Sequence, residues 1–208
     1  MVKSLTSLLL IHGAGSGPEV FDGWESDFPG VCLTAVDLQK NLEVRRATMR
    51  DYAAAVAAAA AHTPAPVALC GWSMGGLVVL HAALLVRPHS VIVLEPSPPA
   101  EVQGFRADVE LREGTFDPEE TYGPFPAGQR ARPESLLART ERQRGISIPA
   151  IPSRSLVIYG DDYRDVRGRR IAAFYGSKEA YFPGFDHWAL VREPIVRLTI
   201  AHFLEVRK

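Results

Sequence analysis

The sequence predicts an α/β domain built on a mostly parallel sheet that helices cover on both faces. Short runs rich in leucine and β-branched residues alternate with helical stretches along the chain, and this alternation is typical of parallel strands joined by crossover helices. The runs are apolar throughout, as expected for strands that are buried on both faces. We expect a single domain over residues 1–208, because a chain of this length hides roughly 70% of its unfolded surface in a core.

Six runs are predicted as strands, and helical stretches separate several of them. The strands are expected at residues 5–11, 31–36, 67–70, 91–95, 155–159 and 179–182. Before the third strand, Thr48 and Asp51 form a capping-box-like helix start, followed by an alanine-rich stretch that stops at Pro64. A second helix is expected from Met74 to the residues before Pro88.

Residues 96–152 differ from the rest of the chain in amino-acid composition, and we expect them to form an inserted lid. Proline and glycine interrupt this segment repeatedly, and it lacks apolar runs like those that predict the strands. A segment interrupted so often could hardly form an independent core. Arginines between Arg130 and Arg144 alternate with Glu134 and Glu141, and we interpret this stretch as a solvated helix face.

Composition and charge argue against several classes of partner. The chain has 23 lysines and arginines against 24 aspartates and glutamates, which gives a formal net charge of −1. Such a chain has no long-range field to attract nucleic acid or an anionic membrane, so no nucleic acid partner is expected. No run reaches the roughly 18 apolar residues that a membrane span needs. The expected partner is a small-molecule substrate, and the oligomeric state stays open.

The N-terminus and the cysteines indicate where the protein works. Lys3 before the first apolar run imitates a signal peptide, but the run is short and ends as a strand meeting a glycine turn would. Cys32 and Cys70 lie in apolar stretches and are expected to be buried thiols. Their spacing fits neither a zinc site nor a disulfide framework. We therefore expect a cytoplasmic protein without a metal.

The sharpest functional motif is G-x-S-x-G at residues 71–75, centred on Ser73 and lying between a predicted strand and a predicted helix. This is the sequence context of a nucleophile elbow. The serine occupies a tight, strained turn, and the flanking glycines let strand and helix approach each other. Ser73 is therefore the candidate nucleophile.

A serine hydroxyl needs an adjacent base, and that base needs an acid to orient it. His187 is the candidate base, because it lies in a loop after the last predicted strand. Asp161 and Asp162 follow the strand at residues 155–159, so both carboxylates reach the same edge of the sheet. The chain order is serine, aspartate, histidine, as expected for this motif.

These motifs together resemble those of the α/β-hydrolase superfamily. The resemblance rests on H-G-x-G at residues 12–15, the elbow at 71–75, the acid pair after Gly160 and the histidine loop at 184–188. It covers nearly the whole chain apart from the lid, and it implies the α/β-hydrolase fold.

The resemblance also implies site residues. Members with an H-G-x-G turn form an oxyanion hole from two main-chain N–H groups, which here belong to Ala14 and Met74. The usual acid lies three residues after the glycine, where this chain has Tyr163. Asp162 is the nearer match and the first choice, and Asp161 is the second. Glu95 is the third, because some members take the acid from the end of the preceding strand.

The function predicted from these residues is hydrolysis of a small carboxylic ester or thioester through an acyl-enzyme intermediate, without a metal or organic cofactor. Trp72 and Trp188 adjoin the candidate nucleophile and base and are candidates for the substrate pocket. Phe125 is a third candidate, in a lid that also carries Phe105, Phe116 and Tyr122. These lid aromatics form either an apolar substrate site or the lid's own small core.

Two alternatives belong to other classes of protein. The same fold serves as a ligand-binding module with an idle triad. A nicotinamide-dependent oxidoreductase is the weaker alternative, since Gly13 and Gly15 follow a strand and Asp37 stands where a ribose-binding acid would be. The dinucleotide fingerprint requires a sixth-position glycine, and this chain has Pro18 there.

Overall fold

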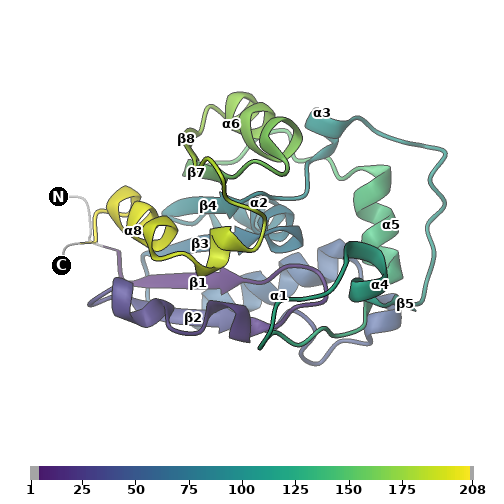
Figure 1. The fold of residues 1–208 in the computed structure, drawn as a ribbon, viewed down its shortest axis with the longest axis horizontal. Helices are drawn as coiled ribbons and strands as arrows, with labels where there is room; N and C mark the ends of the chain where they lie inside the picture. Colours follow the sequence, from purple (N-terminus) through teal and green to yellow (C-terminus); the bar gives the residue numbers. More distant parts are fainter. Residues whose placement is uncertain (1–4, 207–208) are drawn as a thin grey trace.

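The computed structural model describes residues 5–206, and its central feature is a parallel sheet (Figure 1). Within these residues six strands pair in the order β2-β1-β3-β4-β7-β8, and every neighbouring pair is parallel. The strands are β1 (Ser7–Ile11), β2 (Cys32–Val36), β3 (Val67–Trp72), β4 (Ser90–Leu94), β7 (Arg154–Tyr159) and β8 (Lys178–Tyr181). The predicted strands and fold class are confirmed, with small differences at the strand ends. Lys3, in the stretch that imitates a signal peptide, lies outside the described residues.

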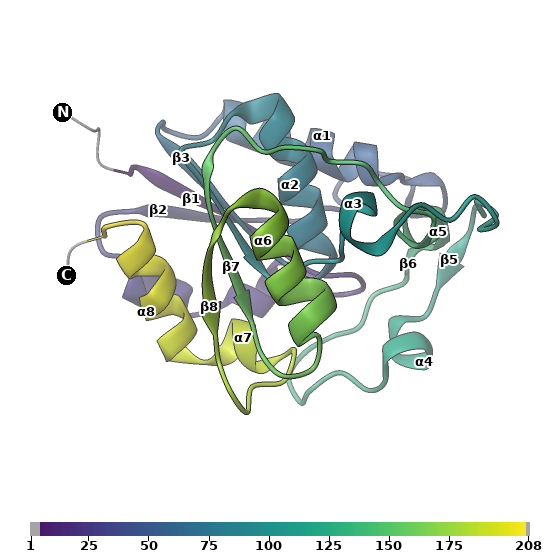
Figure 2. The ribbon, with the colours of Figure 1, turned by 90° about the horizontal axis from the view of Figure 1, so that it is seen from above.

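Apolar side chains of alternate strand residues enter two cores, one on each face of the sheet. In β1, Leu9 and Ile11 belong to one buried cluster, and Leu8 and Leu10 belong to the other. The first core lies under α1 (Met49–Ala61), α2 (Met74–Val86) and α6 (Arg170–Tyr175), and the second under α7 (Ala189–Arg192) and α8 (Pro194–Phe203). Figure 2 shows α1 and α2 on one side of the strands and α8 on the other. Helices on both faces explain why the strands are apolar throughout.

The two central helices begin as the sequence predicts. The Thr48 hydroxyl accepts the Asp51 N–H at 3.1 Å and the Asp51 carboxylate accepts the Thr48 N–H at 2.9 Å, which completes a capping box at the start of α1. Helix α2 begins directly after Ser73 and ends before Arg87, which has a left-handed backbone conformation. The nucleophile candidate is thus fixed between the end of β3 and the first turn of α2.

The expected lid segment leaves the sheet after β4 and returns at β7. It contains α3 (Ala100–Gln103), β5 (Thr115–Phe116), α4 (Pro118–Tyr122), β6 (Glu134–Ser135) and α5 (Leu136–Arg144), with β5 and β6 paired antiparallel. Figure 1 places α4, α5 and β5 beyond the ends toward which the strand arrows of β1 and β3 point. Val102, Ala138 and Ile148 from this segment are buried in the core that also contains α1 and α2. The segment therefore shares its core with the body of the protein.

Short 3-10 and π-helical turns complete the described structure. They are η1 (Pro18–Phe21), η2 (Trp24–Asp27), η3 (Val44–Arg46) and the π-helical turn η4 (Arg164–Arg169). Trp24 in η2 is fully buried beneath α8 and donates from Nε1 to the Val191 carbonyl at 3.0 Å. In residues 5–206, none of the helices combines the length and the apolar character required to cross a membrane.

Two expectations about burial are wrong. Cys32 is exposed whereas Cys70 is buried, because Cys32 begins β2 at the edge of the sheet and Cys70 lies in the interior strand β3. The arginine-rich stretch is not simply a solvated face, since Glu134 is fully buried and Arg132 is mostly buried in an ion pair with Asp37. Their partners come from segments far away in the sequence, so local charge spacing did not reveal them.

Candidate active site

Ser73 lies on a strained turn between β3 and α2. Its backbone angles are φ 57° and ψ −120°, in a region that non-glycine residues rarely adopt. Two hydrogen bonds hold the turn in place: the Ser73 N–H donates to the Leu94 carbonyl at 2.9 Å, and the Ser97 N–H donates to the Ser73 carbonyl at 2.9 Å. The end of β4 and the segment that follows it therefore fix the conformation of the turn that carries the serine side chain.

The elbow requires glycine on both sides of the serine. A Cβ atom at Gly71 would lie 2.2 Å from the Gly75 carbonyl oxygen, and one at Gly75 would lie 2.3 Å from the Ile11 carbonyl oxygen. Both distances are far below van der Waals contact, and in both cases the obstacle is backbone. The two motif glycines allow α2 to begin directly against β1 and β3.

A buried carboxylate contacts the imidazole of His187. Its Nδ1 lies 2.7 Å from Oε2 of Glu95, which is fully buried at the end of β4. The other oxygen of Glu95 accepts the Gly160 N–H at 2.8 Å. The Trp72 indole donates to the His187 carbonyl at 3.0 Å, and the two rings lie 4.9 Å apart between centroids. With Nδ1 facing Glu95, Nε2 is the nitrogen left to exchange a proton with a substrate-side group.

Two opposing influences act on the charge of this imidazole. Burial lowers the pKa of His187 below its usual value, whereas the hydrogen bond and negative charge of Glu95 raise it. Burial is the larger effect. The ring is consequently neutral at neutral pH, which is the state that a general base requires.

The structure places the three candidate acids differently from the expected ranking. Glu95, the third choice, contacts the imidazole. The first choice, Asp162, accepts the main-chain N–H of His187 at 3.0 Å, and the second choice, Asp161, accepts the Gly184 N–H at 2.7 Å. Both aspartates thus support the backbone of the histidine loop and not its ring. Asp162 is exposed and lines the cavity, whereas Glu95 is fully buried and directly follows β4.

The turn after β1 carries the expected oxyanion donors and is fixed by His12. Fully buried His12 accepts the Leu38 N–H on Nε2 at 3.1 Å, so Nδ1 carries the hydrogen that it donates to the Gly13 carbonyl at 2.9 Å. The Ser16 hydroxyl also donates to the Gly13 carbonyl, at 3.0 Å. The main-chain N–H groups of Ala14 and Met74 have no protein acceptor within residues 5–206, so both are available to a bound oxygen.

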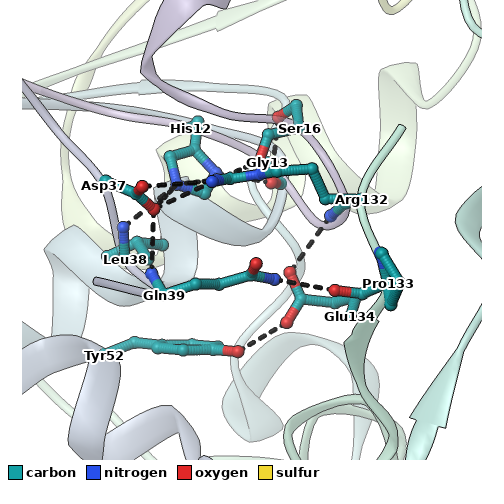
Figure 3. A network of polar contacts seen from close by, with 11 residues as sticks. His12, Gly13, Ser16, Asp37, Leu38, Gln39, Tyr52, Arg132, Pro133 and Glu134 are labelled. Atoms are coloured by element: carbon teal, nitrogen blue, oxygen red, sulfur yellow. Dashed lines mark hydrogen bonds and ion pairs between the residues drawn. The ribbon is translucent and has the colours of Figure 1, made fainter. Parts of the chain in front are cut away.

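A second support for this turn comes from the lid segment (Figure 3). The Arg132 N–H donates to the Gly15 carbonyl at 2.8 Å, and its guanidinium donates to the Ser16 carbonyl at 2.8 Å. The Glu134 carboxylate accepts the Gly15 N–H at 3.0 Å. We call Arg132 and Glu134 the lid clamp. Sequence reasoning missed it, because its two members lie about 120 positions from the turn along the chain and show no periodic pattern.

The lid clamp also forms hydrogen bonds with residues outside the turn. Arg132 forms two hydrogen bonds of 3.1 Å with the Asp37 carboxylate, and Glu134 accepts the Tyr52 hydroxyl at 2.5 Å. The hydrogen bonds and positive charge of Arg132, together with the Gln39 N–H that Asp37 accepts, hold the pKa of Asp37 well below its usual range. Asp37 is thus engaged as an ionised partner of the clamp, which removes the free carboxylate that the dinucleotide alternative needs for a ribose.

A cavity of about 270 Å³ brings most of the predicted site together. It is lined by Ala14, Ser73, Asp162 and His187, by the aromatic residues Trp72, Tyr122, Phe125, Tyr163 and Trp188, and by Gly123, Arg142, Arg167 and Asp186. Among the described residues Ser73 and His187 share this cavity without a direct hydrogen bond. Such catalytic contacts are often long before substrate binds and tighten in the reacting complex.

The aromatic candidates divide between the cavity and its surroundings. Trp72 packs on Trp188 with ring centroids 4.7 Å apart, and Phe125 packs on Trp188 at 4.9 Å. From the lid, Tyr122 and Phe125 line the cavity. Phe116 lies behind Tyr122 at 5.9 Å, and Phe105 is exposed. The lid aromatics therefore serve both as a cavity wall and as packing within the lid.

Comparison with known proteins identifies a family whose model matches most of this chain. Residues 8–203 match the model of the alpha/beta hydrolase family. A pimeloyl-[acyl-carrier protein] methyl ester esterase of Neisseria meningitidis serogroup A is 37% identical over 84 residues, which is 40% of this chain and 27% of that protein. A homologue from serogroup C is 36% identical over 84 residues and is covered to 33%. The chain thus matches a third or less of the length of these curated relatives.

Solved structures resemble the fold over almost the whole chain. The RedJ thioesterase from the prodiginine biosynthetic pathway of Streptomyces coelicolor has a TM-score of 0.66 at 19% identity, covering 98% of this chain and 91% of that one. Polyneuridine aldehyde esterase has a TM-score of 0.65 at 17% identity, covering 97% and 100%. At these identities the likeness concerns the fold.

Proposed function

The chain belongs to the alpha/beta hydrolase family, and from this premise we propose that it is a serine hydrolase of small carboxylic esters or thioesters. The observation that carries the proposal is the joint placement of Ser73 and the Glu95-supported imidazole of His187 in one cavity. A nucleophile, a base and an orienting acid are the groups that acyl transfer through a covalent intermediate needs.

In the proposed reaction His187 Nε2 takes the proton of the Ser73 hydroxyl while the serine oxygen attacks the substrate carbonyl carbon. The carbonyl oxygen becomes an oxyanion, which the main-chain N–H groups of Ala14 and Met74 stabilise. Collapse of this intermediate breaks the bond to the alcohol or thiol, which leaves with the proton from His187. Glu95 stabilises the transient imidazolium.

The second half of the proposed reaction regenerates the enzyme. His187 takes a proton from water, whose oxygen attacks the acyl-enzyme carbonyl, and the carboxylic acid leaves as Ser73 recovers its proton. Every proton is transferred through the imidazole of His187, so the proposed reaction requires neither a metal nor an organic cofactor.

The names of the similar proteins support an ester or thioester as the bond that is cleaved. The Neisseria meningitidis proteins are named methyl ester esterases, and RedJ is named a thioesterase. Serine at the elbow also fits an acyl-enzyme route. Aspartate at this position would instead fit dehalogenase or epoxide hydrolase chemistry.

Substitution of the nucleophile tests the proposal. We expect Ser73→Ala to lower kcat/KM for p-nitrophenyl esters by at least about 10⁴-fold, with an unchanged melting temperature. Ser26→Ala is the matched control, because its hydroxyl lies on the exposed surface and donates only to the Gly23 carbonyl. The control should retain full activity. Equal turnover by Ser73→Ala and the unmodified protein would refute the assignment, and absence of turnover in both would favour a binding module.

A further inference from the structure

We propose that the substrate carries an anionic group, a carboxylate or a phosphate, that Arg142 and Arg167 bind inside the cavity. This inference rests on the proposed function and deepens it by naming the substrate class. Arg142 comes from α5 in the lid segment, and Arg167 comes from η4 after β7. Both line the same cavity as Ser73 and His187.

The Arg142 guanidinium is buried and only partly hydrogen-bonded. Its Nη1 donates to the Ser97 hydroxyl at 3.3 Å. Within residues 5–206 its Nε and Nη2 atoms are inaccessible to solvent and have no hydrogen-bond partner. Buried donors without acceptors are rare, and those of a charged group are the most unfavourable. If the Arg142 side chain turns toward the cavity that it lines, an acceptor supplied by the substrate would satisfy these two atoms.

Arg167 brings a second positive charge to the same wall. Its guanidinium carbon lies 4.1 Å from the centre of the Tyr163 ring. Burial lowers the pKa of Arg167, and the positive charge of Arg142 also lowers it, whereas Tyr163 and Glu95 raise it. Both arginines line the cavity. Among the described residues neither arginine forms an ion pair with a carboxylate.

The carboxylates near the two arginines accept hydrogen bonds from other groups. Glu95 is held by His187 and by the Gly160 N–H. Asp162 accepts the His187 N–H, and Asp186 accepts the Ala189 N–H at 2.7 Å. The positive charge of Arg142 and Arg167 is therefore only partly offset, although Asp162 and Asp186 also line the cavity.

The chemistry of this pair selects a small anion. Guanidinium groups present parallel N–H donors that match the oxygens of carboxylates and phosphates. A cavity of about 270 Å³ with aromatic walls has room for a short apolar chain that ends in such a group. A neutral ester of the same shape would leave the buried donors of Arg142 unsatisfied, so the site would discriminate against it.

Three esters of matched shape test the inference. They are mono-p-nitrophenyl adipate, its phosphonate analogue p-nitrophenyl 5-phosphonopentanoate, and the neutral isostere p-nitrophenyl 6-methylheptanoate. We expect kcat/KM for at least one anionic ester to exceed that for the neutral ester by about 10- to 100-fold, the range for a hydrogen-bonded charge. The better of the two anionic esters identifies carboxylate or phosphate as the recognised group.

Variants assign the preference to the two arginines. Arg142→Met and Arg167→Met should each reduce the ratio of anionic to neutral kcat/KM toward one. Arg144→Met is the matched control, because Arg144 is on the same helix but outside the cavity lining and should keep the full ratio. Melting temperatures identify any variant that fails to fold, and the neutral polar substitutions Arg142→Gln and Arg167→Gln then replace it.

The outcomes separate this inference from the proposed function. Equal hydrolysis of neutral and anionic esters by the unmodified protein, or a ratio that persists in both arginine variants, overturns the anion site and leaves the esterase intact. Absence of any turnover overturns the proposed function. In that case the anion site is tested separately by titrating Ser73→Ala with adipate and measuring tryptophan fluorescence. Saturable binding that is lost in the double variant Ser73→Ala/Arg142→Met supports the anion site. Absence of binding to Ser73→Ala overturns it.

Discussion

Ser73 and Glu95 both have a positive φ angle. Their φ angles are 57° and 40°, and positive φ is uncommon for residues other than glycine. Each directly follows one of two neighbouring strands, β3 and β4, so both side chains emerge at the same edge of the sheet. Strain of this kind persists only where the surroundings over-determine the backbone, and it is concentrated at functional sites.

The choice between Glu95 and Asp162 as the acid is open to a direct test. Glu95→Gln removes the negative charge facing Nδ1 of His187 and should lower kcat by about 10³- to 10⁴-fold. In Asp162→Asn the side-chain oxygen still accepts the main-chain N–H of His187, so kcat should change by less than about threefold. Steady-state kinetics on a p-nitrophenyl ester compares the two. A larger loss in Asp162→Asn would return the acid role to Asp162.

The pH dependence of activity follows from the environment of His187. The base works only when neutral, and burial lowers its pKa below the usual value of 6.5. We expect kcat/KM to be constant at neutral pH and to fall as the pH decreases through a value below 6.5. Because Glu95 raises this pKa, the residual activity of Glu95→Gln should fall at a still lower pH. An acid limb above 6.5 would contradict the assignment of burial as the larger effect.

At the scale of elements, the lid segment forms part of the candidate site. Its clamp residues Arg132 and Glu134 contact the turn that follows β1, and its helix α5 supplies Arg142 to the cavity. The turn is thus held from two sides, by His12 from within the body and by the clamp from the lid. A substitution in the lid segment should therefore displace the turn that carries Ala14, a candidate oxyanion donor.

Glu134→Gln tests this connection. The buried Glu134 side chain accepts three hydrogen bonds, from Gly15, Tyr52 and Ser135. An amide presents one oxygen and one NH₂ group, so at least one donor would face another donor, at a cost of about 1–3 kcal/mol in unfolding free energy. We expect displacement of the turn to lower kcat by about 10-fold or more. The upper limit is the loss of about 10²- to 10³-fold that removal of one oxyanion donor causes.

The matched control for Glu134→Gln is Glu120→Gln, an exposed residue of α4 in the same segment. Its kcat and urea denaturation midpoint should equal those of the unmodified protein. Normal kcat in a destabilised Glu134→Gln would mean that the clamp supports the fold but not the oxyanion turn.

At the scale of the whole molecule, the lid and the sheet should unfold together. Lid residues Val102, Ala138 and Ile148 are buried in the core shared with α1 and α2, so the lid has no separate core to melt. We expect one cooperative urea transition. Far-UV circular dichroism reports all helices, and fluorescence reports tryptophans that lie outside residues 96–152. The two curves should coincide, and an earlier transition in circular dichroism alone would contradict a shared core.

The sequence by itself determined the fold class and six strands, and it predicted Ser73 and His187 as the candidate nucleophile and base. These properties are local. Apolar runs predict buried strands, and a glycine-flanked serine between strand and helix predicts an elbow, because each depends on neighbours along the chain. The candidate base needed in addition the order of the strands and of serine, aspartate and histidine along the chain.

Only the tertiary structure decided which carboxylate faces the imidazole, where the lid arginines lie and how the oxyanion turn is held. Glu95 meets His187 across 92 positions of the chain, and Glu134 meets Gly15 across 119. From residue types and spacing, three carboxylates remained candidates for the acid that orients His187. The same information led us to expect that the lid arginines lie on a solvated helix face. Electrostatic and hydrogen-bond partners are selected by distance in space, and the crossover connections of a parallel sheet bring together residues that are far apart in sequence.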